Sequence, residues 1–169
     1  MERKLTIAAN IAIIIAVIAI LASLARNDSI ARSRSTSSTG QLPRPSALVG
    51  HTFPVQQSWS PYNKTIVLAL AVGCHFCSAS APFYKDLAGY ASTHHINLVA
   101  LLPQGLEESR AYLKELGLTI PTVQQVNFMD IKVVGTPTLF LVDSQGVVQK
   151  VWEGQLKETE QKKVLSALG

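Results

Sequence analysis

The sequence predicts an α/β domain in which helices flank a central mixed sheet on both faces. Two observations lead to this prediction. Continuous apolar runs of strand length alternate along the chain with amphipathic segments of helical length. The first of these runs also ends in a glycine, which is followed by Cys74 and Cys77 in a Cys-x-x-Cys arrangement at the expected start of a helix.

The predicted elements alternate in type along the chain. Apolar runs predict strands over residues 65–72, 96–102, 138–142 and 147–152. Apolar residues at helical spacing predict helices over residues 75–91, 106–116 and 156–168. The turn at residues 143–146 should join the last two strands in a hairpin. Pro82 should kink the first helix because proline removes a hydrogen bond there. For residues 119–134 we expect a short strand and a helical turn.

The N-terminal part of the chain predicts a membrane anchor. Residues 5–25 are almost all apolar, and a helix of about 20 such residues spans a bilayer. Ser23-Leu24-Ala25 also fits a signal-peptide cleavage site, so a cleaved leader is the alternative. Residues 26–46 are rich in Ser, Thr and Arg, which predicts a disordered linker. The folded domain is therefore expected over residues 47–169, outside the cytoplasm on the periplasmic side under either interpretation.

The basic balance of the chain comes from the flanks of this apolar segment. Six of the 15 Lys and Arg residues precede residue 47, but only two of the 11 Asp and Glu residues do. The folded part therefore holds nine residues of each sign. A domain without a basic surplus lacks the charge for a phosphate-binding patch, which argues against a nucleic-acid partner.

The two cysteines form the candidate redox site. A Cys at a helix N-terminus faces unpaired backbone N–H groups, which stabilise a thiolate, so Cys74 is the candidate nucleophile. His75 should lower its pKa further by adding positive charge. Cys77 lies one turn on and is suited to resolve a mixed disulfide. Phe76 would present an apolar surface to extended chains.

Other interpretations of the cysteine pair are weaker. A structural disulfide would close a very small loop, where the entropic stabilisation is least. The pair is half of a zinc site, but no second pair exists, and the adjacent His94 and His95 point apart. No metal is therefore expected. Thr136-Pro137 precedes an apolar strand, and it is either an ordinary strand edge or a cis bend that aims the Thr136 backbone at an approaching peptide.

Residues 49–169 resemble the thioredoxin superfamily. The resemblance lies in the Cys-x-x-Cys after a buried strand, in Pro82, and in Thr136-Pro137 before the hairpin. Residues 50–54, the inserted helix from Leu106 and residues 120–122 resemble its TlpA-like, membrane-anchored branch, some members of which serve cytochrome c maturation. The resemblance implies that Pro137 is cis, that it lies against the cysteines, and that the Thr136 backbone binds substrate.

The sequence also departs from the family pattern. Gly73 stands where the family usually has Trp before the first Cys. Ser80 stands where TlpA-like reductases often have a Glu. Related thiol peroxidases carry a Thr three residues before the reactive Cys, where this chain has Ala71, and copper carriers of this fold use a Cys-x-x-x-Cys with a later His. Thiol peroxidase and a copper-binding or other non-catalytic module remain the alternatives.

The favoured function is extracytoplasmic disulfide exchange with protein thiols and disulfides, in the direction of reduction. A membrane electron donor or acceptor would be the redox partner. No cofactor is expected beyond the Cys74–Cys77 disulfide itself, and the chain is expected to be a monomer. A His beside the nucleophile would instead favour oxidation, because it stabilises the reduced enzyme.

Overall fold

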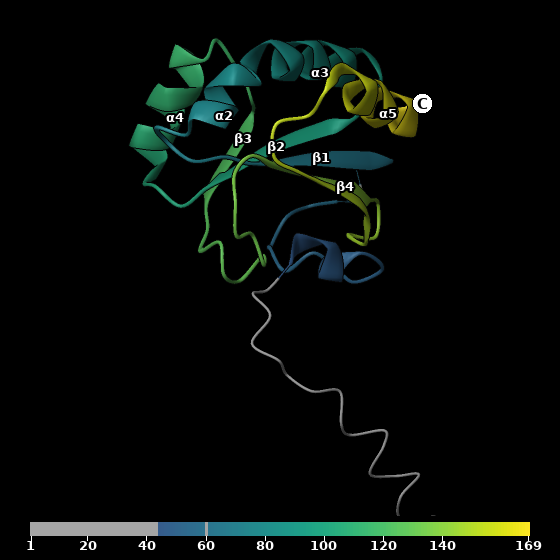
Figure 1. The fold of residues 1–169 in the computed structure, drawn as a ribbon. Helices are drawn as coiled ribbons and strands as arrows, with labels where there is room; N and C mark the ends of the chain where they lie inside the picture. The colour runs from purple at the N-terminus through teal and green to yellow at the C-terminus, as the bar shows by residue number, and fades with distance from the viewer. Residues whose placement is uncertain (1–43, 60) are drawn as a thin grey trace, which may run out of the picture. The chain divides into compact units, whose positions relative to one another are not determined.

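The centre of the domain is a five-stranded mixed sheet with the strand order β3-β2-β1-β4-β5 (Figure 1). The structure is a computed structural model that describes residues 44–59 and 61–169. The strands are β1 (Lys64–Ala69), β2 (Asn97–Leu102), β3 (Thr122–Gln125), β4 (Thr138–Asp143) and β5 (Val148–Glu153). The helices are the 3₁₀ helix η1 (Pro45–Leu48), α2 (His75–Ala79), α3 (Ala81–Thr93), α4 (Leu106–Glu115) and α5 (Glu158–Leu168).

Strand direction divides the sheet into a parallel and an antiparallel half. β1 runs parallel to β2, and β2 runs parallel to β3. On the other side β1 runs antiparallel to β4, and β4 forms the predicted hairpin with β5. All six residues of β2 are buried, as are residues 65–69 of β1. This burial explains why both strands read as unbroken apolar runs, since each is covered on both faces.

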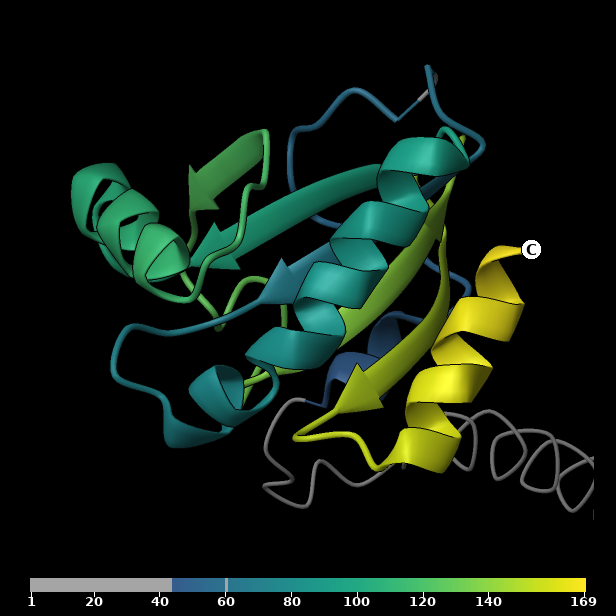
Figure 2. The same cartoon turned by 90° about the horizontal axis from the view of Figure 1, so that it is seen from above.

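The α-helices cover one face of the sheet. Seen from that side, α3 crosses above the strands, with α5 on one side of it and α4 on the other side, beyond β3 (Figure 2). Leu87 from α3, Leu113 from α4 and Val164 from α5 all belong to the same core as Ile66 and Leu68 of β1. The alternate residues of β1 face the opposite side, as expected for the period of two in a strand.

The opposite face is covered mainly by irregular chain. Leu48 of η1, Phe53, Ile131 and Val133 pack there against alternate strand residues such as Val67. The helices expected on both faces are therefore represented on this side by the short η1 together with residues 49–59 and 126–133. Phe53 packs edge-on against the ring of Phe140, with ring centroids 4.9 Å apart.

The helix predicted over residues 75–91 is two helices. α2 ends and α3 begins at Ser80, so Pro82 lies in the first turn of α3 and not inside a single kinked helix. The first N–H groups of a helix have no partner within it, which is why proline fits there without loss of a hydrogen bond. Residues 119–134 contain the expected short strand, β3, followed by a turn at residues 128–132.

The N-terminal predictions lie mostly outside the described residues. This is true of the apolar segment 5–25 and of most of the linker 26–46. η1 begins at Pro45, within the range predicted as linker, and both Pro45 and Leu48 are buried. None of the helices in residues 44–59 and 61–169 is long and apolar enough to cross a membrane.

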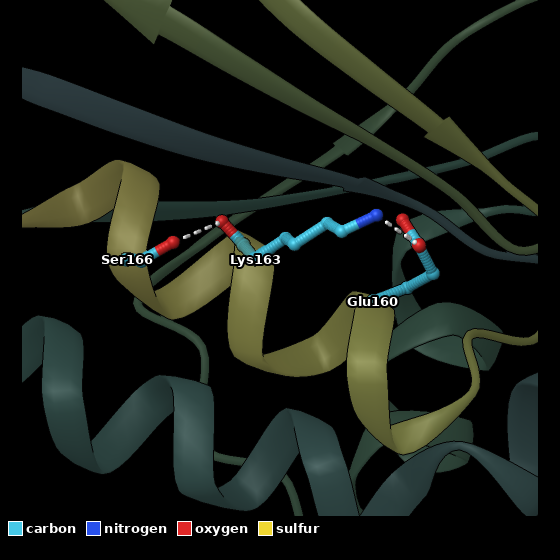
Figure 3. A network of polar contacts seen from close by, with 3 residues as sticks. All are labelled: Glu160, Lys163 and Ser166. Carbon is cyan, nitrogen blue, oxygen red and sulfur yellow. Dashed lines mark hydrogen bonds and ion pairs between the residues drawn. The ribbon is translucent and has the colours of Figure 1, made fainter.

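The exposed side of α5 carries a short network of polar contacts (Figure 3). Lys163 Nζ lies 2.7 Å from Glu160 Oε1, and Ser166 Oγ donates to the Lys163 carbonyl at 3.0 Å. Exposed ion pairs contribute only about 0–1 kcal/mol. Burial of Val164 and Leu168 against the sheet therefore holds α5 in place more than these contacts do.

Candidate redox site

A tight turn after β1 delivers the cysteine pair to the edge of the sheet. The Cys74 N–H donates to the Ala71 carbonyl at 3.2 Å, and Gly73 between them has φ +74°. Only glycine adopts that backbone conformation without a steric penalty. Val72 N–H donates to Gln104 Oε1 at 3.3 Å, which ties the turn to the end of β2. The turn ends with Cys74 as the N-cap of α2.

Cys74 caps the helix with its own sulfur. Its Sγ accepts the Cys77 N–H at 3.2 Å, in the position where a Ser or Asp oxygen usually accepts. Burial by itself would raise the pKa of the Cys74 thiol. The net shift is downward, because the side chains of Cys77 and Thr136 and the N–H groups of Cys77 and Phe76 hydrogen-bond the sulfur. Cys74 is half-buried, so this sulfur remains accessible.

Cys77 has the opposite character. Its side chain is fully buried, and both cysteines are free thiols in this structure. Burial, followed by the hydrogen bond with Cys74, raises the pKa of Cys77 to about 12 from 9.0. One thiol of the pair is therefore poised to ionise while the other stays protonated. The assignment of Cys74 as nucleophile and Cys77 as resolving cysteine stays a prediction, and both pKa shifts lie in the direction that it requires.

The loop before β4 meets the cysteines from a distant part of the chain. The Thr136–Pro137 peptide bond is cis, as the resemblance implies. Cys74 Sγ lies 3.4 Å from the Thr136 carbonyl oxygen, although 62 residues separate the two. Thr138 Oγ1 donates to the Gly135 carbonyl at 2.8 Å, and Gly154 N–H donates to the Pro137 carbonyl at 2.7 Å. These bonds hold the loop beside Cys74. The role of Thr136 and Pro137 in binding substrate stays a prediction.

His75 and Phe76 lie on the exposed side of α2. Phe76 is 55% exposed, which leaves its ring free to contact another molecule. The His75 ring packs edge-on against it, with ring centroids 5.6 Å apart. Hydrogen bonds account for the lowered pKa of Cys74, and His75 is not among the groups that cause it. The tuning of Cys74 by His75 stays a prediction.

Two further residues at the site were not predicted. Tyr112 of α4 reaches the first turn of α2, where its hydroxyl lies 3.4 Å from the Cys74 carbonyl oxygen and 3.3 Å from Ser78 Oγ. The sequence places Tyr112 on the apolar face of a helix, which does not separate it from ordinary core residues. Ser80, at the position of the family's frequent Glu, is buried and donates its hydroxyl proton to the Phe76 carbonyl at 2.8 Å.

The structure has no candidate metal centre within residues 44–59 and 61–169. No three His, Cys, Asp or Glu side chains of this part of the chain lie close enough together to bind an ion.

A mixed sheet of this order, with a dithiol where β1 turns into α2 and a cis-proline loop beside it, defines a thioredoxin-fold domain. Solved structures share the fold. A thioredoxin-family thiol:disulfide interchange protein from Chlorobium tepidum TLS is 22% identical over 66% of this chain and 83% of its own, with a TM-score of 0.53. A thiol-disulfide isomerase from Corynebacterium glutamicum is 16% identical over 71% of this chain and 91% of its own, with a TM-score of 0.55.

A third structure, the thioredoxin domain of a thiol-disulfide oxidoreductase from Bacteroides vulgatus, gives a TM-score of 0.57 at 12% identity. It covers 70% of this chain and 96% of the other. No protein-family model matches the sequence, and a search of curated proteins finds no relative. At these identities the likeness establishes the fold. The chain has the thioredoxin fold that the sequence predicted.

Proposed function

We propose that the domain is a thiol-disulfide oxidoreductase that exchanges disulfides with protein substrates through Cys74 and Cys77. The difference between the two thiols is the observation that carries the proposal. Cys74 is accessible and its pKa is lowered, whereas Cys77 is buried and its pKa is raised to about 12. A structural pair needs no such difference, but attack followed by resolution does.

The reaction begins with the Cys74 thiolate. Its sulfur attacks one sulfur of a substrate disulfide, a mixed disulfide forms, and the other substrate sulfur leaves as a thiolate that takes up a proton. Cys77 then loses its proton and attacks Cys74 Sγ, which releases the second substrate thiol and closes the Cys74–Cys77 disulfide. Two electrons pass from the dithiol to the substrate. A partner dithiol must return them for a second turnover.

The surroundings of Cys74 suit an extended protein chain. The Thr136 carbonyl lies 3.4 Å from Cys74 Sγ, so a chain bound along this loop brings its own disulfide to the reactive sulfur. Phe76 adds an exposed apolar ring two residues along the chain. Unfolded chains expose both apolar side chains and unpaired backbone groups. The Phe76 ring can contact the apolar side chains, and the loop at Thr136 can bind the backbone groups.

We favour reduction of substrates outside the cytoplasm, with residues 5–25 as the membrane anchor and a membrane protein as electron donor. The apolar segment and the family resemblance support this direction and location. The lowered pKa of Cys74 acts in the other direction, since stabilising the thiolate stabilises the reduced enzyme and makes it more oxidising. The reduction potential therefore decides the direction.

The test is the dithiol–disulfide equilibrium of the full-length protein in glutathione buffers, read by alkylation and mass spectrometry. A two-electron couple that Cys74→Ser abolishes is expected. A potential near about −270 mV supports reduction, and one near about −120 mV supports oxidation. A cysteine pair that stays inert to glutathione would exclude exchange chemistry.

Docking of protein substrates has a separate test. Phe76→Ala should slow reduction of an unfolded, disulfide-bonded protein without slowing the reaction with glutathione. Val49→Ala is the matched control, because Val49 is 45% exposed but pairs with Val148 at the far end of β5 from the Pro137 loop. Equal effects of the two variants on both substrates would argue against docking at Phe76.

A further inference from the structure

The hydroxyl of Tyr112 connects α4 to the first turn of α2. It lies 3.4 Å from the Cys74 carbonyl oxygen and 3.3 Å from Ser78 Oγ. Ser78 Oγ is itself 3.3 Å from the same Cys74 carbonyl. The three oxygens form a closed triangle, one corner of which belongs to the proposed nucleophile.

Proton counting shows which way these contacts run. The two hydroxyls carry one proton each and the carbonyl carries none, so the carbonyl accepts, and at most two of the three contacts are hydrogen bonds at any moment. The Cys74 carbonyl also accepts the Ser78 N–H at 3.1 Å. Donors from two helices therefore converge on one oxygen. The Tyr112 side chain is 6% exposed, so packing and not solvent determines where its hydroxyl lies.

Tyr112 remains a donor across the neutral range. Burial raises the pKa of its phenol, a hydrogen bond with Ser78 lowers it, and negative charge on Cys77 and Cys74 raises it again, with a net upward shift. The phenol therefore stays protonated while the thiolate forms beside it.

The first turn of α2 has no N-cap side chain other than the reactive cysteine. The helix spans only the five residues His75–Ala79. That turn also carries the Cys77 N–H, which donates to Cys74 Sγ at 3.2 Å. Whatever orients the turn therefore sets how well the thiolate is stabilised.

We propose that Tyr112 is a positioning residue for disulfide exchange. Through the Cys74 carbonyl it holds the first turn of α2 in the orientation that aims the Cys77 N–H at Cys74 Sγ. The inserted helix α4 thereby contributes to the reactivity of a cysteine 38 residues earlier in the chain. The effect of Tyr112 on disulfide exchange rests on the proposed function. Its effect on the Cys74 thiolate does not, because the thiolate can be titrated directly.

The test is Tyr112→Phe in the full-length protein, which keeps the ring and removes the hydroxyl. In reduced protein, the ultraviolet absorbance of the Cys74 thiolate should appear at higher pH than in wild type. Alkylation of Cys74 by iodoacetamide, at a pH below its pKa, should be about two- to threefold slower, since a weaker hydrogen bond lowers the thiolate fraction and the gain in nucleophilicity offsets part of the loss. The glutathione potential should become more negative.

Tyr90→Phe is the matched control, because Tyr90 lies near the far end of α3 and stacks on His94. It should leave the titration and the alkylation rate unchanged. Ser78→Ala removes another corner of the triangle at an exposed position, so it gives the same readout even where Tyr112→Phe folds poorly. The effects of Tyr112→Phe and Ser78→Ala should combine to less than their sum.

Two results bear on different proposals. A Cys74 titration and alkylation rate in Tyr112→Phe equal to those of wild type and Tyr90→Phe would overturn the role of Tyr112. A wild-type protein whose Cys74 has a lowered pKa, yet which exchanges with no disulfide, would overturn the proposed function. The titration of Tyr112→Phe would still test the role of Tyr112.

Discussion

The two cysteines should differ greatly in reactivity when each is left alone in the chain. The perturbation is a pair of single variants, Cys77→Ser, which leaves Cys74, and Cys74→Ser, which leaves Cys77. Burial is the largest cause of the raised pKa of Cys77, and it persists in Cys74→Ser, whereas the hydrogen bond from Cys74 does not. The pKa of the remaining Cys77 should therefore lie somewhat below 12 but well above that of an exposed cysteine.

The magnitude follows from the thiolate fraction. A thiol with a pKa of about 12 is ionised to about one part in 10⁵ at pH 7, against a few per cent for a free cysteine of pKa about 8.5. Allowing for the lost hydrogen bond, Cys77 should alkylate at least about a hundredfold more slowly than free cysteine. Cys74, with its lowered pKa, should alkylate faster than free cysteine at the same pH.

The assay is alkylation by iodoacetamide at pH 7 in the two variants, followed by intact mass, with an unstructured cysteine peptide as reference. In denaturant, the alkylation rates of Cys74 and Cys77 should become equal, because unfolding exposes both thiols to water. Native rates within a few-fold of each other would refute the assignment of distinct roles, and a faster Cys77 would reverse it.

Four further predictions concern stability, each read by chemical denaturation of the reduced protein. Gly146→Ala should cost about 2–4 kcal/mol, because φ is +81° and an added Cβ would lie 2.7 Å from the Trp59 ring. Gly154→Ala has a similar φ of +78° but open space, so it should cost only about 1–2 kcal/mol; equal costs would show that Trp59 moves aside freely. Leu87→Ala, at a fully buried position, should cost about 2–5 kcal/mol, and a loss below about 1 kcal/mol would contradict its place in the core. The folded-state pKa of Cys77 lies above the ordinary 9.0, so its contribution to stability is complete below pH 9 and is lost as pH rises toward about 12. Cys77→Ser should remove that part of the pH dependence, and an unchanged alkaline profile would contradict it.

Features that depend on residues close together in the sequence were predictable. The buried strands β1 and β2 show as unbroken apolar runs, and the hairpin shows in the turn at residues 143–146. Pro82 indicated a break in the first helix, but not that the chain would resolve it as two helices meeting at Ser80. Proline lacks a backbone N–H, so it predicts a break in the helix nearby. The sequence does not say whether that break is a kink inside one helix or the first turn of a new helix, because proline is compatible with both.

Coverage of the sheet was less predictable. Its second face is closed by η1 together with residues 49–59 and 126–133, and irregular chain of this kind has no period from which its packing can be read. Leu48 is buried there, and Pro45, at the end of the segment whose composition indicated a linker, is buried as well. Composition averages over many residues, whereas burial depends on where two particular side chains lie.

By itself, the sequence determined that a cysteine pair follows a buried strand at a helix N-terminus, and hence which thiol is the candidate nucleophile. The reason is that strand, turn and helix start are contiguous in the chain. Only the tertiary structure decided what surrounds that thiol. The pairing of β1 with β4 and β2 brings the Thr136 carbonyl to 3.4 Å from Cys74 Sγ, and the placement of α4 brings the Tyr112 hydroxyl to the Cys74 carbonyl. Those contacts join residues 62 and 38 positions apart, and no local pattern specifies a distance between them.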